Sequence, residues 1–295
     1  MKRILTLATV GVTVALFMTI SLTSANASPT LKPFTIGGQR PASVFPPGKY
    51  QGPAPILISL HGYTSSGAKQ EAYLKMRSLL SKRGIIYVTP DGTPDGGGNR
   101  FWNASKACCN FYGSGVDDVK YLMSLVDQVN AKFPVNRKRI YFVGHSNGGF
   151  MAFRLACEKS DQIAGIVSFA GSMNVDRATC PAKKPISVLL IHGTADPTIL
   201  PAGGSINGNS YTSDQSNLDF WGTKDKCLPK VGLPAIFKLS DYDTSIAGKE
   251  TKIFSYNCNT KTNLQYWSIS QGLHVPVIDP AFSANMVAWL LAQSK

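Results

Sequence analysis

Short apolar runs alternate with amphipathic segments along the chain, and this alternation predicts a mostly parallel central sheet. Apolar positions at helical spacing lie between the runs, most clearly in the helix that starts at Asp117 and Asp118. The predicted strands cover residues 34–46 (a pair), 55–60, 85–88, 139–143, 166–169, 186–191, 252–256 and 264–269. The other predicted helices cover residues 66–83, 148–157, 213–222 and 280–293. This order favours an α/β fold with helices on both faces of the sheet.

The first 27 residues have the features of a secretory signal peptide. Lys2 and Arg3 precede an apolar stretch at Val10–Ile20, and Ala25-Asn26-Ala27 offers small residues to a signal peptidase. A membrane anchor is the alternative, but the apolar stretch is shorter than the roughly 20 residues that a spanning helix needs. We therefore expect cleavage before Ser28, one catalytic domain over 28–295, no membrane anchor after cleavage, and a secreted protein, extracellular or periplasmic.

All six cysteines lie after the predicted cleavage site. An even number of cysteines in an oxidising compartment favours disulfides. The sequence has no CxxC pair that would indicate a site for zinc or another metal. Cys227 and Cys258 bracket the segment between a predicted helix and the late strand pair, so we expect them to bond. Adjacent Cys108 and Cys109 are expected to bond elsewhere. The partners of the remaining cysteines stay open: Cys108, Cys109, Cys157 and Cys180.

The chain is basic, with 30 Lys and Arg against 17 Asp and Glu and a formal net charge of +13. Nucleic acid is one class of partner that such a charge allows. The positive residues are scattered, however, with no dense basic run interleaved with aromatic residues. We therefore expect no nucleic-acid partner, and attribute the charge to solubility and loose attraction to anionic polymers.

The pentapeptide Gly144-His145-Ser146-Asn147-Gly148 matches the G-x-S-x-G nucleophile elbow, a tight strand-to-helix turn that exposes a serine hydroxyl. An ordinary glycine-rich turn would share this short pattern. The apolar residues 140–143 run directly into it, and an amphipathic helix follows, as the elbow requires. Ser146 is therefore the predicted nucleophile.

A serine hydroxyl needs a base, and the base needs an acid that orients it. In this type of fold the chain order is serine, acid, histidine. His274 follows the strand at 264–269, and Asp196 follows the strand at 186–191, where Pro197 fixes the turn. We predict these two as base and acid. The other histidines close strands or occupy the variable elbow position: His61, His145 and His192.

An oxyanion hole needs backbone amides that point at the developing negative charge. One amide should come from Asn147, the residue after the nucleophile, and the other from Tyr63 in the loop after the strand at 55–60. The Tyr63 ring is also predicted to bind substrate as a wall of the acyl pocket, although simple packing is equally compatible. Trp102 is predicted either to line the pocket rim and bind substrate or only to pack the loop at 93–114.

Taken together, these motifs resemble the family of secreted polyhydroxybutyrate depolymerases and feruloyl or acetylxylan esterases. The matching pieces run through most of the chain: Leu60-His61-Gly62, Pro90-Asp91-Gly92, Phe101-Trp102-Asn103-Ala104, Val116-Asp117-Asp118-Val119, residues 144–149, residues 154–158, residues 192–197 and Gly203-Gly204. The resemblance implies the α/β-hydrolase fold and the same triad, with no cofactor. Two departures affect the pocket: Val275 stands where members often have tryptophan, and Tyr63 where they often have cysteine.

The predicted reaction is hydrolysis of a carboxylic ester through an acyl-enzyme, with no cofactor or metal. Polymeric or oligomeric polyester, such as polyhydroxybutyrate, is the favoured substrate, because Val275-Pro276 leaves an open aliphatic edge beside His274. The alternatives within the enzyme class are feruloyl or acetylxylan esters and, since a triad also cleaves amides, peptides. A secreted non-catalytic binding protein is the alternative from another class. Such a protein is expected to lose a triad member, and this chain keeps all three.

Overall fold

The computed structural model describes residues 32–228 and 237–295. The predicted signal peptide at 1–27 lies outside these residues, so it stays a prediction, as does the single domain over 28–295. Among the described residues, no helix is both long enough and apolar enough to cross a bilayer.

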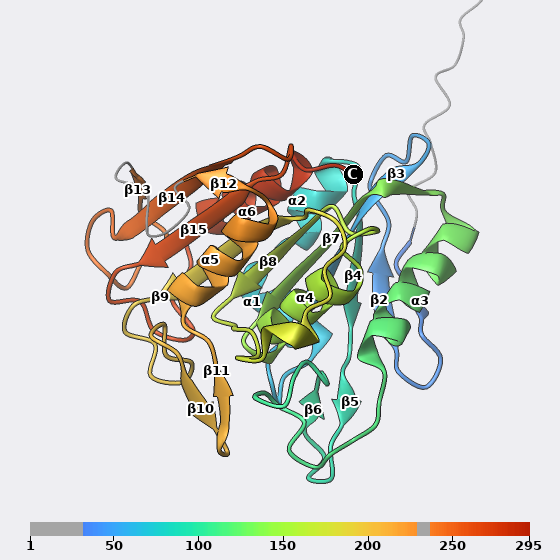
Figure 1. Cartoon of the computed structure of the whole chain (residues 1–295). Helices are drawn as coiled ribbons and strands as arrows, with labels where there is room; N and C mark the ends of the chain where they lie inside the picture. Colours follow the sequence, from blue (N-terminus) through green and yellow to red (C-terminus); the bar gives the residue numbers. More distant parts are fainter. Residues whose placement is uncertain (1–31, 229–236) are drawn as a thin grey trace, which may run out of the picture.

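An eleven-stranded sheet forms the centre of the molecule (Figure 1). The strands follow the order β1-β2-β4-β3-β7-β8-β9-β15-β14-β12, and β13 pairs with β14. Their bounds are β1 Phe34–Ile36, β2 Ala42–Phe45, β3 Ala54–Leu60, β4 Ile86–Pro90, β7 Val135–His145, β8 Gly165–Phe169, β9 Ser187–Gly193, β12 Cys227–Leu228, β13 Phe237–Ser240, β14 Thr251–Cys258 and β15 Leu264–Ile269. The six strands from β4 to β15 in this order pair in parallel, and antiparallel strands flank them.

Helices cover both faces of the sheet, as predicted. The helices are α1 Gly67–Leu74, α2 Arg77–Lys82, α3 Asp118–Lys132, α4 Asn147–Glu158, α5 Asp214–Lys224 and α6 Pro280–Leu291, with a short 3₁₀ helix at Arg177–Thr179. Buried side chains of α3, α4 and α5 pack in one core cluster, and those of α1, α2 and α6 pack in the other. The α/β architecture with a mostly parallel sheet is therefore confirmed.

Burial on both faces explains why the central strands appear in the sequence as continuous apolar runs. Every residue of β4, β8 and β9 is buried, so these strands need no polar positions facing water. Parallel strands present their carboxyl ends at one edge of the sheet. The loops after β7, β9 and β15 leave from that edge, and they carry the three predicted catalytic residues.

The predicted helix over 66–83 is broken into α1 and α2. Lys75 caps α1 with a left-handed backbone at φ 51°, and the Glu71 carboxylate accepts the amides of Met76 and Arg77. These local bonds compete with continued helix, which periodicity alone does not reveal. Two short hairpins were not predicted either: β5 Thr93–Pro94 with β6 Arg100–Phe101, and β10 Gly204–Ile206 with β11 Asn209–Tyr211.

The described cysteines form three disulfides. Cys227 bonds Cys258, which confirms the prediction, and Cys157 bonds Cys180. The expectation that Cys108 and Cys109 bond elsewhere is wrong, because they bond each other across a cis peptide with their Cα atoms 3.1 Å apart. A trans peptide would hold these Cα atoms about 3.8 Å apart.

Replacing Cys227 and Cys258 together with alanine should lower the free energy of unfolding by about 3–4 kcal/mol, because the bond closes a loop of sequence separation 31. Denaturant unfolding of the variant against the parent protein measures this loss. The bond lies at the β12–β14 edge of the sheet, so catalytic efficiency on an aryl ester should stay unchanged. Equal stability of the two proteins would contradict the prediction.

Candidate active site

Ser146 lies at a sharp turn between β7 and α4. Its backbone angles, φ 56° and ψ −120°, are strained for a residue with a side chain. The turn is tight enough to require glycine on both sides: a Cβ on Gly144 would lie 2.0 Å from the Gly148 carbonyl oxygen, and one on Gly148 would lie 2.2 Å from the Leu60 carbonyl oxygen. The elbow therefore exposes the serine hydroxyl at the carboxyl edge of the sheet.

His274 and Asp196 meet beside this turn. The His274 Nδ1 lies 2.7 Å from Asp196 Oδ2, although 78 positions separate the two residues in the chain. The hydrogen bond uses Nδ1, and so leaves Nε2 available for a serine proton. Ser146 and His274 line the same cavity, of about 310 Å³. The three predicted catalytic residues thus come together from the loops after β7, β9 and β15.

The Asp196 carboxylate is fully buried and accepts four hydrogen bonds. Its Oδ1 accepts the amides of Thr198 and Ile199 at 2.8 and 3.0 Å, and its Oδ2 accepts from His274 and His192. Burial alone would raise the pKa of Asp196, but the hydrogen bonds from His192, His274 and Ile199 outweigh burial and hold that pKa well below its usual range. Asp196 therefore stays ionised.

Sequence reasoning missed His192 and Asp214 as parts of this network. The His192 ring lies between two carboxylates, with Nε2 3.1 Å from Asp196 Oδ2 and Nδ1 2.8 Å from Asp214 Oδ1. Burial disfavours the charged ring, but the two carboxylates outweigh burial and raise the pKa of His192 to about 9. Asp214 begins α5, so no local pattern could have linked it to β9.

The other two histidines have positioning roles in the structure. His61 accepts the Gly92 amide at Nε2 and faces the Gly62 carbonyl with Nδ1, so it joins two loops. His145 Nε2 lies 2.8 Å from the backbone oxygen of His274 and supports the loop of the predicted base. Burial lowers the pKa of each of these two rings to about 4, so both are neutral at pH 7.

The loop after β3 lies directly against the nucleophile. A Cβ on Gly62 would be 3.3 Å from the Ser146 Cβ, and the next residue, Tyr63, lines the same cavity as Ser146. Asn147 is the first residue of α4, so its amide has no partner within the helix. The Asn147 side chain exchanges two hydrogen bonds with the Trp102 backbone, at 2.7 and 3.0 Å. These positions suit the two predicted oxyanion donors.

Tyr63 lines the cavity at the nucleophile, whereas Trp102 does not. The Tyr63 hydroxyl donates to Asp95 at 2.6 Å, and its ring packs edge-on against Phe111. Trp102 is 0% exposed, and its ring nitrogen donates to the His61 carbonyl oxygen. The structure therefore supports the packing alternative for Trp102 and corrects its prediction as a substrate contact. Tyr73, which sequence reasoning did not select, lines the cavity as well.

The loop that carries His274 is anchored at two points. Asp243 accepts the Val277 amide at 3.2 Å, and the Thr244 amide donates to the Val277 carbonyl at 2.8 Å. The Tyr73 hydroxyl donates to the Pro276 carbonyl at 3.0 Å. The position of His274 thus depends on the connection between β13 and β14 as well as on the cavity wall.

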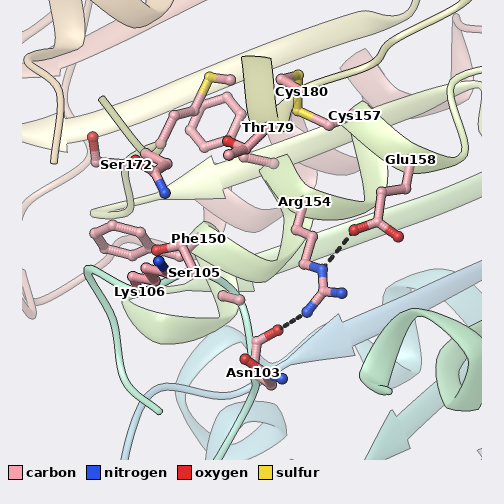
Figure 2. Close-up of a pocket in the computed structure, with 14 residues that line it drawn as sticks. Asn103, Ser105, Lys106, Phe150, Arg154, Cys157, Glu158, Ser172, Thr179 and Cys180 are labelled. Carbon is pink, nitrogen blue, oxygen red and sulfur yellow. Dashed lines mark hydrogen bonds and ion pairs between the residues drawn. A yellow bond between two sulfur atoms is a disulfide. The ribbon is translucent and has the colours of Figure 1, made fainter. Parts of the chain in front are cut away.

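A second cavity, of about 280 Å³, runs along α4 and is shown in Figure 2. Arg154 points from α4 toward Glu158 and toward the backbone oxygen of Asn103, and it bonds both. The Cys157–Cys180 disulfide lies at the far end. None of the predicted triad is among its described lining residues, so the first cavity is the candidate active site.

The chain is similar to known proteins in sequence and in fold. A family model described as phospholipase/carboxylesterase matches residues 47–221. Among solved structures, the acetyl xylan esterase from Aspergillus awamori superposes with a TM-score of 0.59 at 15% identity, over 88% of this chain and 98% of that one. The family match and this superposition confirm the predicted α/β-hydrolase fold.

Curated relatives carry the names that the resemblance implied. Feruloyl esterase B of Piromyces equi is 28% identical over 191 residues, which are 61% of this chain and 34% of the relative. Poly(3-hydroxyalkanoate) depolymerase C of Paucimonas lemoignei is 22% identical over 250 residues, 79% of this chain and 57% of that protein. The chain therefore spans about a third to just over half of the length of these two relatives.

Proposed function

The chain belongs to the phospholipase/carboxylesterase family and is a serine ester hydrolase, and from this premise we propose that Ser146, His274 and Asp196 perform the hydrolysis. One observation carries the assignment: the His274 Nδ1 lies 2.7 Å from the Asp196 carboxylate, and Ser146 shares a cavity with His274. Tyr63 and Asn147 are the proposed oxyanion donors, and the loop of Tyr63 lies against Ser146.

In this mechanism the Ser146 oxygen attacks the ester carbonyl while its proton passes to His274 Nε2. The amides of Tyr63 and Asn147 donate to the oxyanion of the tetrahedral intermediate. The intermediate collapses to an acyl-enzyme as His274 returns the proton to the leaving alcohol. A water molecule then repeats the sequence, and Ser146 is released with the free acid. Asp196 holds the His274 tautomer and stabilises its cation throughout.

For the substrate, we propose an aliphatic polyester of the hydroxyalkanoate type or its oligomers. Leu273, Val275 and Val277 alternate along the loop of His274 and are 57%, 56% and 58% exposed. Such a row of exposed aliphatic side chains beside a catalytic base suits a water-insoluble polymer surface. The burial of Trp102 supports the same choice, because it removes one aromatic ring from the rim.

Feruloyl esters of plant polysaccharide are the second candidate. Tyr63 and Tyr73 both line the cavity, and stacking of an aromatic acid on such a ring contributes about 0.5–1.5 kcal/mol beyond area burial. The similarity to feruloyl esterase B of Piromyces equi favours this alternative as well.

A direct comparison of hydroxybutyrate oligomers with methyl ferulate and acetylated xylan tests the substrate proposal. We expect the oligomers to have the highest catalytic efficiency. Val275→Trp should raise efficiency on ferulate by up to about tenfold, because it adds an aromatic surface at the cavity edge. Val277→Trp is the matched control, since Val277 is equally exposed but is not among the residues that line the cavity. If the catalytic efficiency of the parent enzyme on methyl ferulate exceeds that on the oligomers by more than tenfold, the polyester proposal is rejected.

We further propose that the enzyme is secreted. The signal-like sequence at 1–27 and the three disulfides in the described part of the chain support export to an oxidising compartment. N-terminal sequencing of the protein from culture medium or periplasm should begin at Ser28. Retention in the cytoplasm with free thiols would contradict the proposal.

A further inference from the structure

Two imidazole rings share one oxygen of the Asp196 carboxylate. His274 approaches Asp196 Oδ2 from the cavity at 2.7 Å, and His192 approaches the same atom from β9 at 3.1 Å. Only His274 reaches the cavity, since His192 is 0% exposed. His192 therefore contacts the proposed triad only at Asp196.

The partners of His192 fix where its protons lie. Its Nε2 is 2.9 Å from the Ile199 carbonyl oxygen, which can only accept, so Nε2 carries a proton. Its Nδ1 is 2.8 Å from Asp214 Oδ1, and the other oxygen of Asp214 accepts the Tyr266 hydroxyl at 3.0 Å. When Asp214 is ionised it also only accepts, so Nδ1 then carries a second proton. With these partners the ring is an imidazolium.

We propose that Asp214 and His192 form a buried pair, charged at neutral pH, that positions Asp196 and sets the pH at which His274 becomes a competent base. The proposal rests on the proposed triad, and His192 and Asp214 are positioning residues within it. The raised pKa of His192 agrees with the geometric assignment. This pair also explains how a second carboxylate is tolerated close to Asp196, since the imidazolium lies between the two negative charges.

Because the two rings share Asp196 Oδ2, the charge on His192 should disfavour protonation of His274. The His192 cation competes for Asp196 Oδ2, so it weakens the stabilisation that Asp196 gives to protonated His274. Like charges also disfavour one another at this range. Two other titratable groups face the network: His145, which is neutral because burial lowers its pKa to about 4, and Tyr266, whose pKa burial and Asp214 raise. Neither supplies a competing positive charge at neutral pH.

Nitrogen-15 NMR of the full-length enzyme tests the charge directly. Both ring nitrogens of His192 should show the chemical shifts of an imidazolium from pH 6 to 8, with the signals assigned by their loss in His192→Gln. Asp214→Asn should lower the pH at which the ring loses a proton. One unprotonated ring nitrogen of His192 in the parent enzyme at pH 7 would overturn the proposal, whether or not Asp214→Asn folds.

The pH dependence of catalytic efficiency tests the consequence. In His192→Gln the acid limb of the pH profile of catalytic efficiency should shift to higher pH by about 1 pH unit, because protonated His274 is then better stabilised. The KM should be unchanged. A purely structural role would lower the rate equally at every pH. Ser187→Ala, at the opposite end of β9 and bonded to Gln293, is the control for lost stability and should leave the limb in place. An unmoved limb in His192→Gln overturns the proposal, whereas an active Ser146→Ala would instead reject the triad.

Discussion

Replacing Ser146 with alanine should reduce the kcat for a simple aryl ester by about 10⁶-fold, because no other group can form the acyl-enzyme. The fold should be unaffected, since alanine keeps the backbone of the elbow and removes only one oxygen. A thermal melt followed by circular dichroism, measured beside the steady-state rate, separates these two expectations. A serine-directed phosphonate should label the parent enzyme at Ser146 alone.

Ser168→Ala is the matched control for this variant. Ser168 is fully buried on β8, directly opposite Gly144 in the register of the sheet, and has no place in the proposed reaction. Ser168→Ala should keep both the activity and the phosphonate labelling of the parent enzyme. Loss of labelling in this variant would show that the assignment of Ser146 is mistaken. More than a trace of activity in Ser146→Ala would also reject Ser146 as nucleophile.

Asp196→Asn should lower kcat by up to about 10⁴-fold. The carboxylate accepts two backbone amides on Oδ1 and two imidazole groups on Oδ2, whereas an asparagine has only one accepting atom. If that atom stays with the amides, the new NH₂ group faces His274 Nδ1 and favours the tautomer that cannot accept the serine proton. Steady-state rates across pH 6–9 measure the loss.

A buried aspartate at the end of α5, near the start of β9, provides the control. Asp225 accepts the amide of Ile186, and burial raises its pKa to about 6. Asp225→Asn should keep the catalytic rate of the parent enzyme, whatever it does to stability. Equal losses in Asp196→Asn and Asp225→Asn would show that the effect is general destabilisation and not loss of the orienting acid.

The fold was predictable where the determining signal is local. Continuous apolar runs marked the buried parallel strands, and the antiparallel pair β14–β15 was found from two runs separated by a short polar segment. The β10–β11 hairpin had a usable signal as well, since Asn207-Gly208 favours a turn with two positive φ values, observed here at 49° and 80°. The helix break at Lys75 had none, because it depends on how the Glu71 side chain folds back.

The site residues also separate into those that local sequence patterns predict and those that only tertiary packing brings together. Ser146 was predicted from a five-residue pattern whose glycines the turn requires, and Asp196 and His274 from chain order and strand ends. His192 and Asp214 were missed because their contact joins β9 to α5 through tertiary packing. Trp102 was ambiguous for a related reason: the sequence marks a large aromatic residue near the site but does not say on which side of the loop its ring lies.

The anchor of the His274 loop at Asp243 and Thr244 has a consequence for engineering. Asp243 and Thr244 hold this loop from the connection between β13 and β14, and neither residue is among those that line the cavity. Substitutions in that connection can therefore shift the base relative to Ser146 without changing the surface that contacts substrate. For directed evolution, residues 241–250 are a place where turnover can be tuned separately from selectivity.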